Sequence, residues 1–174
     1  GWGTTAQINR SIQGNSLVVA GTTYQKGIGA HSHSEIVYTL NSSYKYFVAV
    51  AGIDDEVTSD RPSVVFKIYV DGVLLAQSPV VRRHQFWNFN IRLPQNGSQL
   101  KLVATTGDDT NHSDHADWVN AGFKTHSDFS YLSTLLNNWL RTDCSESGSC
   151  DGMDFNSDGS VNFEDFALIA QDWL

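Results

Sequence analysis

The sequence lacks any long hydrophobic run. No stretch of its 174 residues approaches the roughly 20 apolar residues that a membrane-spanning helix needs. Gly1 opens directly into polar sequence, so we recognise no signal peptide, as expected of a mature chain or an excised fragment. The length allows one substantial domain with a sizeable core and a small appendage.

Basic residues are also scarce. The chain has 11 Lys and Arg against 19 Asp and Glu, which gives a formal net charge of −8. Residues 143–174 contain eight of the 19 acidic residues and no Lys or Arg, which leaves 11 acidic and 11 basic residues before them. A formally neutral main part offers no basic footprint for nucleic acid, so we expect no such partner.

Cysteine is nearly absent. Cys144 and Cys150 are flanked by Gly and Ser, and they either close a small disulfide loop in an oxidising compartment or remain free thiols in the cytosol. Two cysteines do not decide between these alternatives. An aromatic content of 11% and few lysines favour a secreted, β-rich protein.

Residues 1–125 have the pattern of β-strands separated by turns. Six segments are rich in Val, Ile, Tyr and Phe: 17–20, 35–40, 44–53, 64–70, 85–93 and 99–106. Asp71-Gly72 and Asn96-Gly97 lie between strands and favour the positive φ angles of tight hairpin turns. The pattern predicts a mostly β protein whose main domain, residues 1–125, is a two-sheet β-sandwich of jelly-roll type.

The hydrophobic period becomes helical after residue 126. Segments 128–141 and 162–174 each place apolar residues on one helical face, and a shift of 34 residues aligns Phe129 with Phe163 and Leu135 with Ile169. This duplication predicts a small α-helical domain over residues 126–174. Its two amphipathic helices should pack on each other or on the sandwich.

Residues 154–165, DFNSDGSVNFED, have the spacing of a calcium-binding EF-hand loop. Positions 1, 3, 5, 7, 9 and 12 fall on Asp154, Asn156, Asp158, Ser160, Asn162 and Asp165. Gly159 at the sixth position permits the sharp turn, Ser160 would contribute its backbone carbonyl, and Asn162 would act through a water. The alternative is an acidic turn before a helix. We predict that this loop binds calcium.

Residues 105–122, TTGDDTNHSDHADWVNAG, concentrate acidic and histidine side chains before and around Trp118. A catalytic zinc needs three converging ligands, and no helix of HExxH type supplies the third. Two opposed glycosidase carboxylates need a cleft that a sandwich of about 125 residues hardly provides. The remaining alternatives are a hydrogen-bonded loop cap and a structural calcium shared with Asp54, Asp55 and Glu56.

Longer segments of the main domain resemble a known family. KGIGAHSHSEIVYTL (26–40), AGIDDEV (51–57), VVFKIYVDGVLLAQSPV (64–80) and residues 100–123 are similar to the NPCBM domain, carbohydrate-binding module family 51. With GWG at 1–3, the resemblance covers residues 1–123. It implies a non-catalytic, lectin-like sandwich joined to a glycoside hydrolase, with recognition of galactose-configured sugars.

The polar residues of this domain suit that chemistry, because sugars are bound by hydrogen bonds to neighbouring hydroxyls and by an aromatic ring under a C–H face. The candidate set is His31, Glu56, His115 and Asp117, with Trp2 or Trp87 as the ring. Trp118 is expected in the core. An alternative pairs His31 with Glu35 as a structural contact. We expect a shallow pocket with an affinity of about 10 µM to 1 mM for a monosaccharide.

The tail resembles the dockerin type I repeat, a calcium loop followed by one helix that is used in duplicate to dock on a cohesin. Asp165 stands where EF-hands have Glu, and no entering helix precedes Asp154. The first copy has no calcium spacing, so one calcium site is implied. The tail is thus expected either to act as an assembly module on a cohesin-type partner or to stabilise the sandwich as an appendage.

Overall fold

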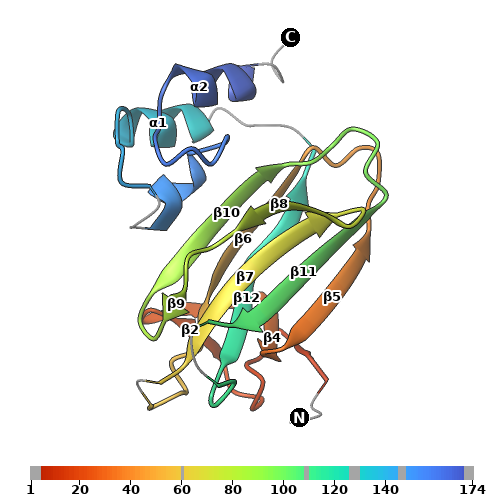
Figure 1. Ribbon diagram of the computed structural model, residues 1–174, viewed down its shortest axis with the longest axis vertical. Coiled ribbons are helices and arrows are strands. Elements are labelled where there is room, and N and C mark those ends of the chain that lie inside the picture. Colours follow the sequence, from red (N-terminus) through yellow and green to blue (C-terminus); the bar gives the residue numbers. More distant parts are fainter. Residues whose placement is uncertain (1–4, 60, 108–109, 126–129, 145–147, 171–174) are drawn as a thin grey trace.

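The computed structural model describes residues 5–59, 61–107, 110–125, 130–144 and 148–170. The strands are β1 (Gln7–Ile8), β2 (Leu17–Val19), β3 (Thr22–Tyr24), β4 (Gly27–His31), β5 (Ser34–Thr39), β6 (Tyr46–Ile53), β7 (Ser63–Val70), β8 (Val73–Gln77), β9 (Val81–Arg82), β10 (Phe86–Arg92), β11 (Gln99–Thr106) and β12 (His115–Lys124). The tail contains α1 (Ser130–Asn137), the 3₁₀ turn η1 (Gly148–Gly152) and α2 (Phe163–Ala170). Figure 1 shows the strands as two layers, with the helices beyond one end of them.

The strand order is that of a jelly roll. One sheet has the order β1-β4-β12-β6-β10, and the other has β5-β11-β7-β8 with β9 paired to β7. Successive long strands therefore alternate between the sheets, and β12 returns to lie between β4 and β6. The predicted two-sheet sandwich is confirmed. All six predicted strand segments correspond to strands, namely β2, β5, β6, β7, β10 and β11.

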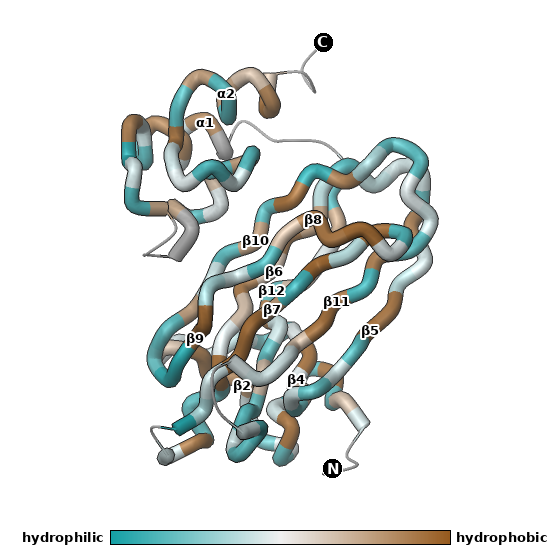
Figure 2. Tube along the Cα trace, viewed as in Figure 1, coloured by the Kyte–Doolittle hydropathy of each residue, from teal (hydrophilic) through white to brown (hydrophobic). Residues whose placement is uncertain are grey.

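The core lies between the two sheets. Trp118 is fully buried there, with the Phe66 ring edge-on at 5.0 Å and the Phe89 ring stacked at 5.6 Å between centroids. Inward-facing residues of β6 and β7 alternate with outward ones, as the period of a strand requires. Hydrophobic segments follow the strands in Figure 2, whereas the loops are largely hydrophilic. The prediction that Trp118 is a core residue is confirmed.

The two turn predictions have different outcomes. Asp71 and Gly72 have φ angles of 48° and 82°, and they join β7 to β8 in a tight hairpin as predicted. Asn96-Gly97 does not form a hairpin, because β10 and β11 belong to different sheets. At Gly97 an added Cβ would lie 2.8 Å from Val70 Cγ1. The missing side chain therefore lets the loop from β10 to β11 pass close to β7 where the chain changes sheets.

The tail packs on the sandwich and on itself. Tyr46 of β6 is fully buried in a cluster with Leu135 and Ile169 of the two helices, and its ring meets the Phe155 ring edge-on at 6.2 Å. Cys144 and Cys150 form a disulfide within this cluster. α1 ends at Asn137, four residues before the expected end, and Phe129 and residues 171–174 lie outside the described residues. In the described part of the chain, no helix has the length and apolar character to cross a membrane.

Candidate functional site

Two histidines face each other where β4 ends and β12 begins. His31 and His115 are register partners in the antiparallel pair, and their ring centroids are 5.5 Å apart with the planes tilted by 59°. Ala30 and Ala116 beside them point into the core, so the alternation of the strands turns both imidazoles to the outer face of the sheet. The fold therefore brings together two residues that are far apart in the sequence.

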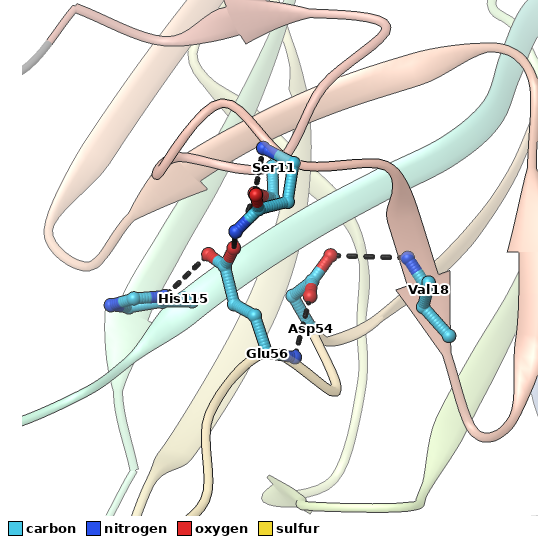
Figure 3. Close-up of polar contacts among 6 residues, drawn as sticks. Ser11, Val18, Asp54, Glu56 and His115 are labelled. Atoms are coloured by element: carbon cyan, nitrogen blue, oxygen red, sulfur yellow. Dashed lines mark hydrogen bonds and ion pairs between the residues drawn. The ribbon is translucent and has the colours of Figure 1, made fainter.

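Glu56 fixes the position of His115. Glu56 Oε1 lies 2.7 Å from His115 Nδ1, and Glu56 Oε2 accepts hydrogen bonds from Ser11 Oγ and from Asn15 Nδ2 at 3.0 Å. Figure 3 shows this carboxylate between His115 and Ser11. Burial alone would raise the pKa of Glu56, but the hydrogen bonds from Ser11, Asn15 and His115 outweigh it, so the pKa is below its usual value. Glu56 is thus an ionised acceptor at neutral pH.

These contacts determine the tautomers of the two imidazoles. His31 Nδ1 lies 2.6 Å from the backbone carbonyl oxygen of Ser32, which can only accept a hydrogen bond. The ionised Glu56 also only accepts, so in both rings Nδ1 carries the proton. In their neutral forms, His31 and His115 therefore keep Nε2 as an acceptor for a hydroxyl group of a ligand.

Asp54 holds the chain that supports this site. It is 1% exposed, and its two carboxylate oxygens accept hydrogen bonds from Glu56 N at 2.8 Å and Val18 N at 3.1 Å (Figure 3). Its own N–H donates to the His115 carbonyl at 3.0 Å. Because it lies behind Glu56, Asp54 is a positioning residue. The sequence had grouped it only with carboxylates that could hold calcium.

Asp117 does not reach the surface. It is 0% exposed, and neither carboxylate oxygen has a hydrogen-bond partner within the described residues. Burial first, and then the neighbouring carboxyl of Asp54, raises the pKa of Asp117 to about 10. The prediction that Asp117 contacts a sugar is therefore wrong, because the N-terminal segment covers it.

Two glycines make room for that cover. Asp117 is the register partner of both Gly29 on β4 and Gly52 on β6. A Cβ on Gly29 would lie 2.4 Å from the Arg10 carbonyl oxygen, and a Cβ on Gly52 would lie 2.3 Å from Val19 Cγ1. The segment that carries Ser11 therefore lies directly on a bare part of the sheet.

We expect Gly29→Ala to displace this segment. The new methyl would overlap the backbone at Arg10, so the free energy of unfolding should fall by about 2 kcal/mol, and the hydrogen bond from Ser11 to Glu56 should weaken. Chemical denaturation measures the change. Gly122→Ala is the matched control, because nothing lies within 4 Å of its added Cβ. Equal stability of the two variants would contradict this packing.

The two predicted tryptophans do not join the histidines in the described structure. Trp87 is the β10 partner of Ala51, whose side chain points into the core, so it lies on the other side of the sheet from His115. Its assignment to the histidine site is wrong for this reason. Trp2 lies outside the described residues.

Other polar residues of the region have structural roles. Asp114 is fully buried and accepts hydrogen bonds from Ser32 Oγ at 2.6 Å and Ser63 N at 3.0 Å. Glu35 lies 3.3 Å from Lys101 Nζ and not against His31, so the alternative His31–Glu35 pair is not formed. Asp108 and Asp109 lie outside the described residues. Within the described part, no three His, Cys, Asp or Glu side chains converge to hold a metal.

The acidic loop of the tail folds around its own amides. Asp154 accepts hydrogen bonds from Asp158 N at 3.1 Å and Gly159 N at 2.9 Å, and Asp165 accepts them from Phe155 N at 2.7 Å and Asn162 N at 2.8 Å. Burial, followed by the Asp165 and Asp158 carboxylates, raises the pKa of Asp154 despite its amide contacts. Asn156 donates to Asp158 at 2.8 Å, and Asp158 accepts from Ser160 N at 2.8 Å.

The chain is similar to proteins that act on or bind glycans. It is 36% identical over 111 residues to a putative endo-α-N-acetylgalactosaminidase of Renibacterium salmoninarum, covering 63% of this chain and 7% of the relative. It is 32% identical over 122 residues to α-1,3-galactosidase B of Akkermansia muciniphila, covering 68% of this chain and 15% of the relative. The chain thus spans only a small part of these relatives.

Solved structures resemble the sandwich. The CBM51 of Clostridium perfringens GH95, in complex with methyl-galactose, has a TM-score of 0.66 and 31% identity and covers 71% of this chain and 90% of that one. CBM51-2 with INT domains of C. perfringens ZmpB, in complex with GlcNAc, has a TM-score of 0.63 and 32% identity and covers 78% and 33%. These are carbohydrate-binding modules, and the NPCBM/NEW2 model matches residues 1–124. The chain belongs to the NPCBM/NEW2 domain family and is a non-catalytic carbohydrate-binding module.

Proposed function

We propose that the histidine site binds a galactose-configured sugar at the outer face of the β4–β12 pair. The observation that carries this proposal is the pair of facing imidazoles whose Nδ1 atoms are both occupied, which leaves Nε2 of His31 and His115 as acceptors. Two neighbouring hydroxyls of one pyranose can donate to such a pair. The methyl-galactose complex of a related module supports the choice of sugar.

Glu56 acts by positioning and makes no direct contact in this proposal. Both its oxygens are occupied by His115, Ser11 and Asn15, so its role is to hold the His115 ring and to keep the proton on Nδ1. We further propose that the module is part of a larger secreted protein and directs a glycoside hydrolase to its glycan. The two enzyme relatives and the disulfide Cys144–Cys150 support this setting.

A titration of the whole chain with methyl galactoside tests the sugar site. We expect saturable binding with a dissociation constant of about 10 µM to 1 mM, because a shallow site with few hydrogen bonds yields only modest affinity. Calorimetry gives the dissociation constant, and ¹⁵N spectra of the imidazoles show whether the sugar binds beside them. N-acetylglucosamine and mannose serve as comparison sugars. Saturable binding that leaves the His31 and His115 resonances unmoved would place the site elsewhere.

A second role, calcium binding by residues 154–165, is favoured by the way the loop curls around Asp154. The amides of the fifth and sixth loop positions, Asp158 and Gly159, already point at its carboxylate. Asp154, Asp158 and Asp165, with the Asn156 amide and the Ser160 carbonyl, are oxygen donors of the type that Ca²⁺ prefers. Calcium would neutralise carboxylates that otherwise repel one another. A cohesin-type partner for this tail stays a prediction from the resemblance.

We expect calcium to raise the thermal stability of the tail and to leave the sandwich core nearly unchanged. Asp158→Ala should lower calcium affinity at least about tenfold, because it removes one charged ligand. Calorimetric titration with CaCl₂ measures this loss. Asp143→Ala, an exposed tail carboxylate paired with Arg141, is the control and should bind like the parent. If both variants released the same heat on calcium binding, the loop would not be the calcium site.

A further inference from the structure

A hollow lies at the junction of the sandwich and the tail. It has a volume of about 420 Å³ and is lined by the edge strands β8 and β10 and by residues of η1 and the 154–159 loop. Figure 1 shows β10 facing the tail. A volume of this size is in the range of small-molecule sites, which start at about 300 Å³.

Trp87 lines the hollow. It packs against the core only in part and remains half-buried on the edge strand β10, and Leu75 of β8 also lines the hollow. An aromatic ring at such an edge offers an apolar surface to the C–H face of a sugar. The exposed residue Gln77, at the end of β8, also lines the hollow.

Asn90, three residues after Trp87 on β10 and therefore on the other face of this edge strand, supplies a polar group without a partner among the described residues. It is 6% exposed, and neither its amide oxygen nor its amide nitrogen has a hydrogen-bond partner within the described residues. Gly152 of η1 has φ +76°, and a Cβ there would lie 2.9 Å from Asn90 Cβ, so the tail is closely fitted to β10 at this point. An unpaired buried amide costs about 1–3 kcal/mol, which a ligand hydroxyl or an ordered water would offset.

The lining favours a neutral ligand. No Lys or Arg is among the described residues that line the hollow, and Asp154 is its one acidic side chain. A phosphate or an acidic peptide would meet no positive charge there. Neutral amides, hydroxyls and one indole ring are the groups with which proteins bind uncharged sugars.

We propose that this junction is a second carbohydrate subsite, which takes a neutral pyranose unit with Trp87 as its apolar platform and which the tail completes. The inference shares the ligand class of the histidine site but none of that site's residues, and it uses the 154–159 loop, whose Asp154 is also a ligand in the calcium proposal. The tail then has a binding role of its own, because η1 and the 154–159 loop form one wall of the subsite.

The test is an NMR titration of the whole chain carrying His115→Ala, which weakens the histidine site, with the readout taken at side chains of the hollow alone. The probes are methyl galactoside, N-acetylglucosamine and a galactose disaccharide, each up to roughly 50 mM. We expect saturable shifts of the Trp87 indole N–H and of the Asn90 side-chain amide. Trp87→Leu in the same background should weaken this binding at least fivefold, and Gln77→Ala should weaken it about twofold.

Phe86→Leu is the matched control, since this exposed aromatic residue adjoins Trp87 on β10 but does not line the hollow. Thermal melting of each variant verifies the fold. Absence of saturable shifts with all three sugars overturns the subsite, and so do equal affinities in Trp87→Leu and Phe86→Leu. Failure of the histidine site is separate, because it is read from the His31 and His115 resonances of the parent chain.

Discussion

Replacement of His115 by alanine is expected to lower the affinity for methyl galactoside at least tenfold, or about 1.4 kcal/mol. The variant loses one hydroxyl acceptor, Nε2. It also leaves Glu56, whose side chain is 8% exposed, without the ring that it holds. The melting temperature should fall by only a few degrees, because Ser11 and Asn15 still bond to the carboxylate. Calorimetry and thermal melting measure the two effects.

His84→Ala is the matched control for this variant. His84 lies at the same end of the sheet, 3.3 Å from Asp55, but its side chain is 60% exposed and has no contact with Glu56 among those described. Its replacement should leave the affinity unchanged. His31→Ala should reproduce the loss seen for His115→Ala. Full affinity in both site variants, with the fold intact, would show that the imidazoles do not touch the sugar.

The positioning role of Glu56 has its own signature. Glu56→Gln should shift the tautomer of His115, which is visible in the ¹⁵N shifts of the ring, while His31 keeps its tautomer through the Ser32 carbonyl. A merely structural Glu56 would change stability without moving the His115 tautomer.

Asp117→Asn is expected to stabilise the protein above neutral pH. The pKa of Asp117 in the fold is about 10, above its ordinary value of 3.8, so the folded state keeps a proton that the unfolded chain releases. The contribution of the protonated Asp117 side chain to the free energy of unfolding is fully present below pH 3.8. It is lost as the pH rises towards 10, by up to about 1.4 kcal/mol per pH unit. Asparagine does not titrate, and its amide can donate to Asp54.

The free energy of unfolding of the variant should therefore exceed that of the parent by about 2 kcal/mol at pH 8 and should be nearly the same at pH 4. Urea denaturation at both pH values measures the difference. Asp71→Asn is the control of opposite sign: hydrogen bonds from Ser98 lower the pKa of Asp71, so its contribution is lost as the pH falls. Parallel pH profiles of parent and Asp117→Asn would show that Asp117 is ionised in the fold.

The fold was predictable because several long strands, such as β6 and β7, carry their own hydrophobic alternation. Residues 118–123 have the pattern of a strand, but β12 begins three residues earlier, because His115 to Asp117 have the composition of a polar loop. Asp117 is buried within the strand because its partners Gly29 and Gly52, which are distant in the sequence, let the chain at Arg10 and Val19 approach the sheet there. That information comes from pairing and is absent from any local window.

The candidate site was predictable only in part, because some of its contacts also depend on which strands pair. His31, Glu56 and His115 belong to motifs of one family, and the structure brings them together. Ser11 and Asn15 were missed because their contact with Glu56 spans more than 40 residues. Trp87 was misassigned because the face that a side chain takes depends on strand register, which its neighbours in sequence do not specify.

Strand β12 also determines the distance between the proposed sugar site and the tail. It begins at His115 in the proposed sugar site and ends at Lys124, next to the segment that leads into the tail. Ten residues of strand at about 3.3 Å each, less a little for the irregularity after Val119, span roughly 30 Å. A glycan bound at one end of the sheet is thus separated by this length from any partner joined to the tail. Both can be bound at the same time.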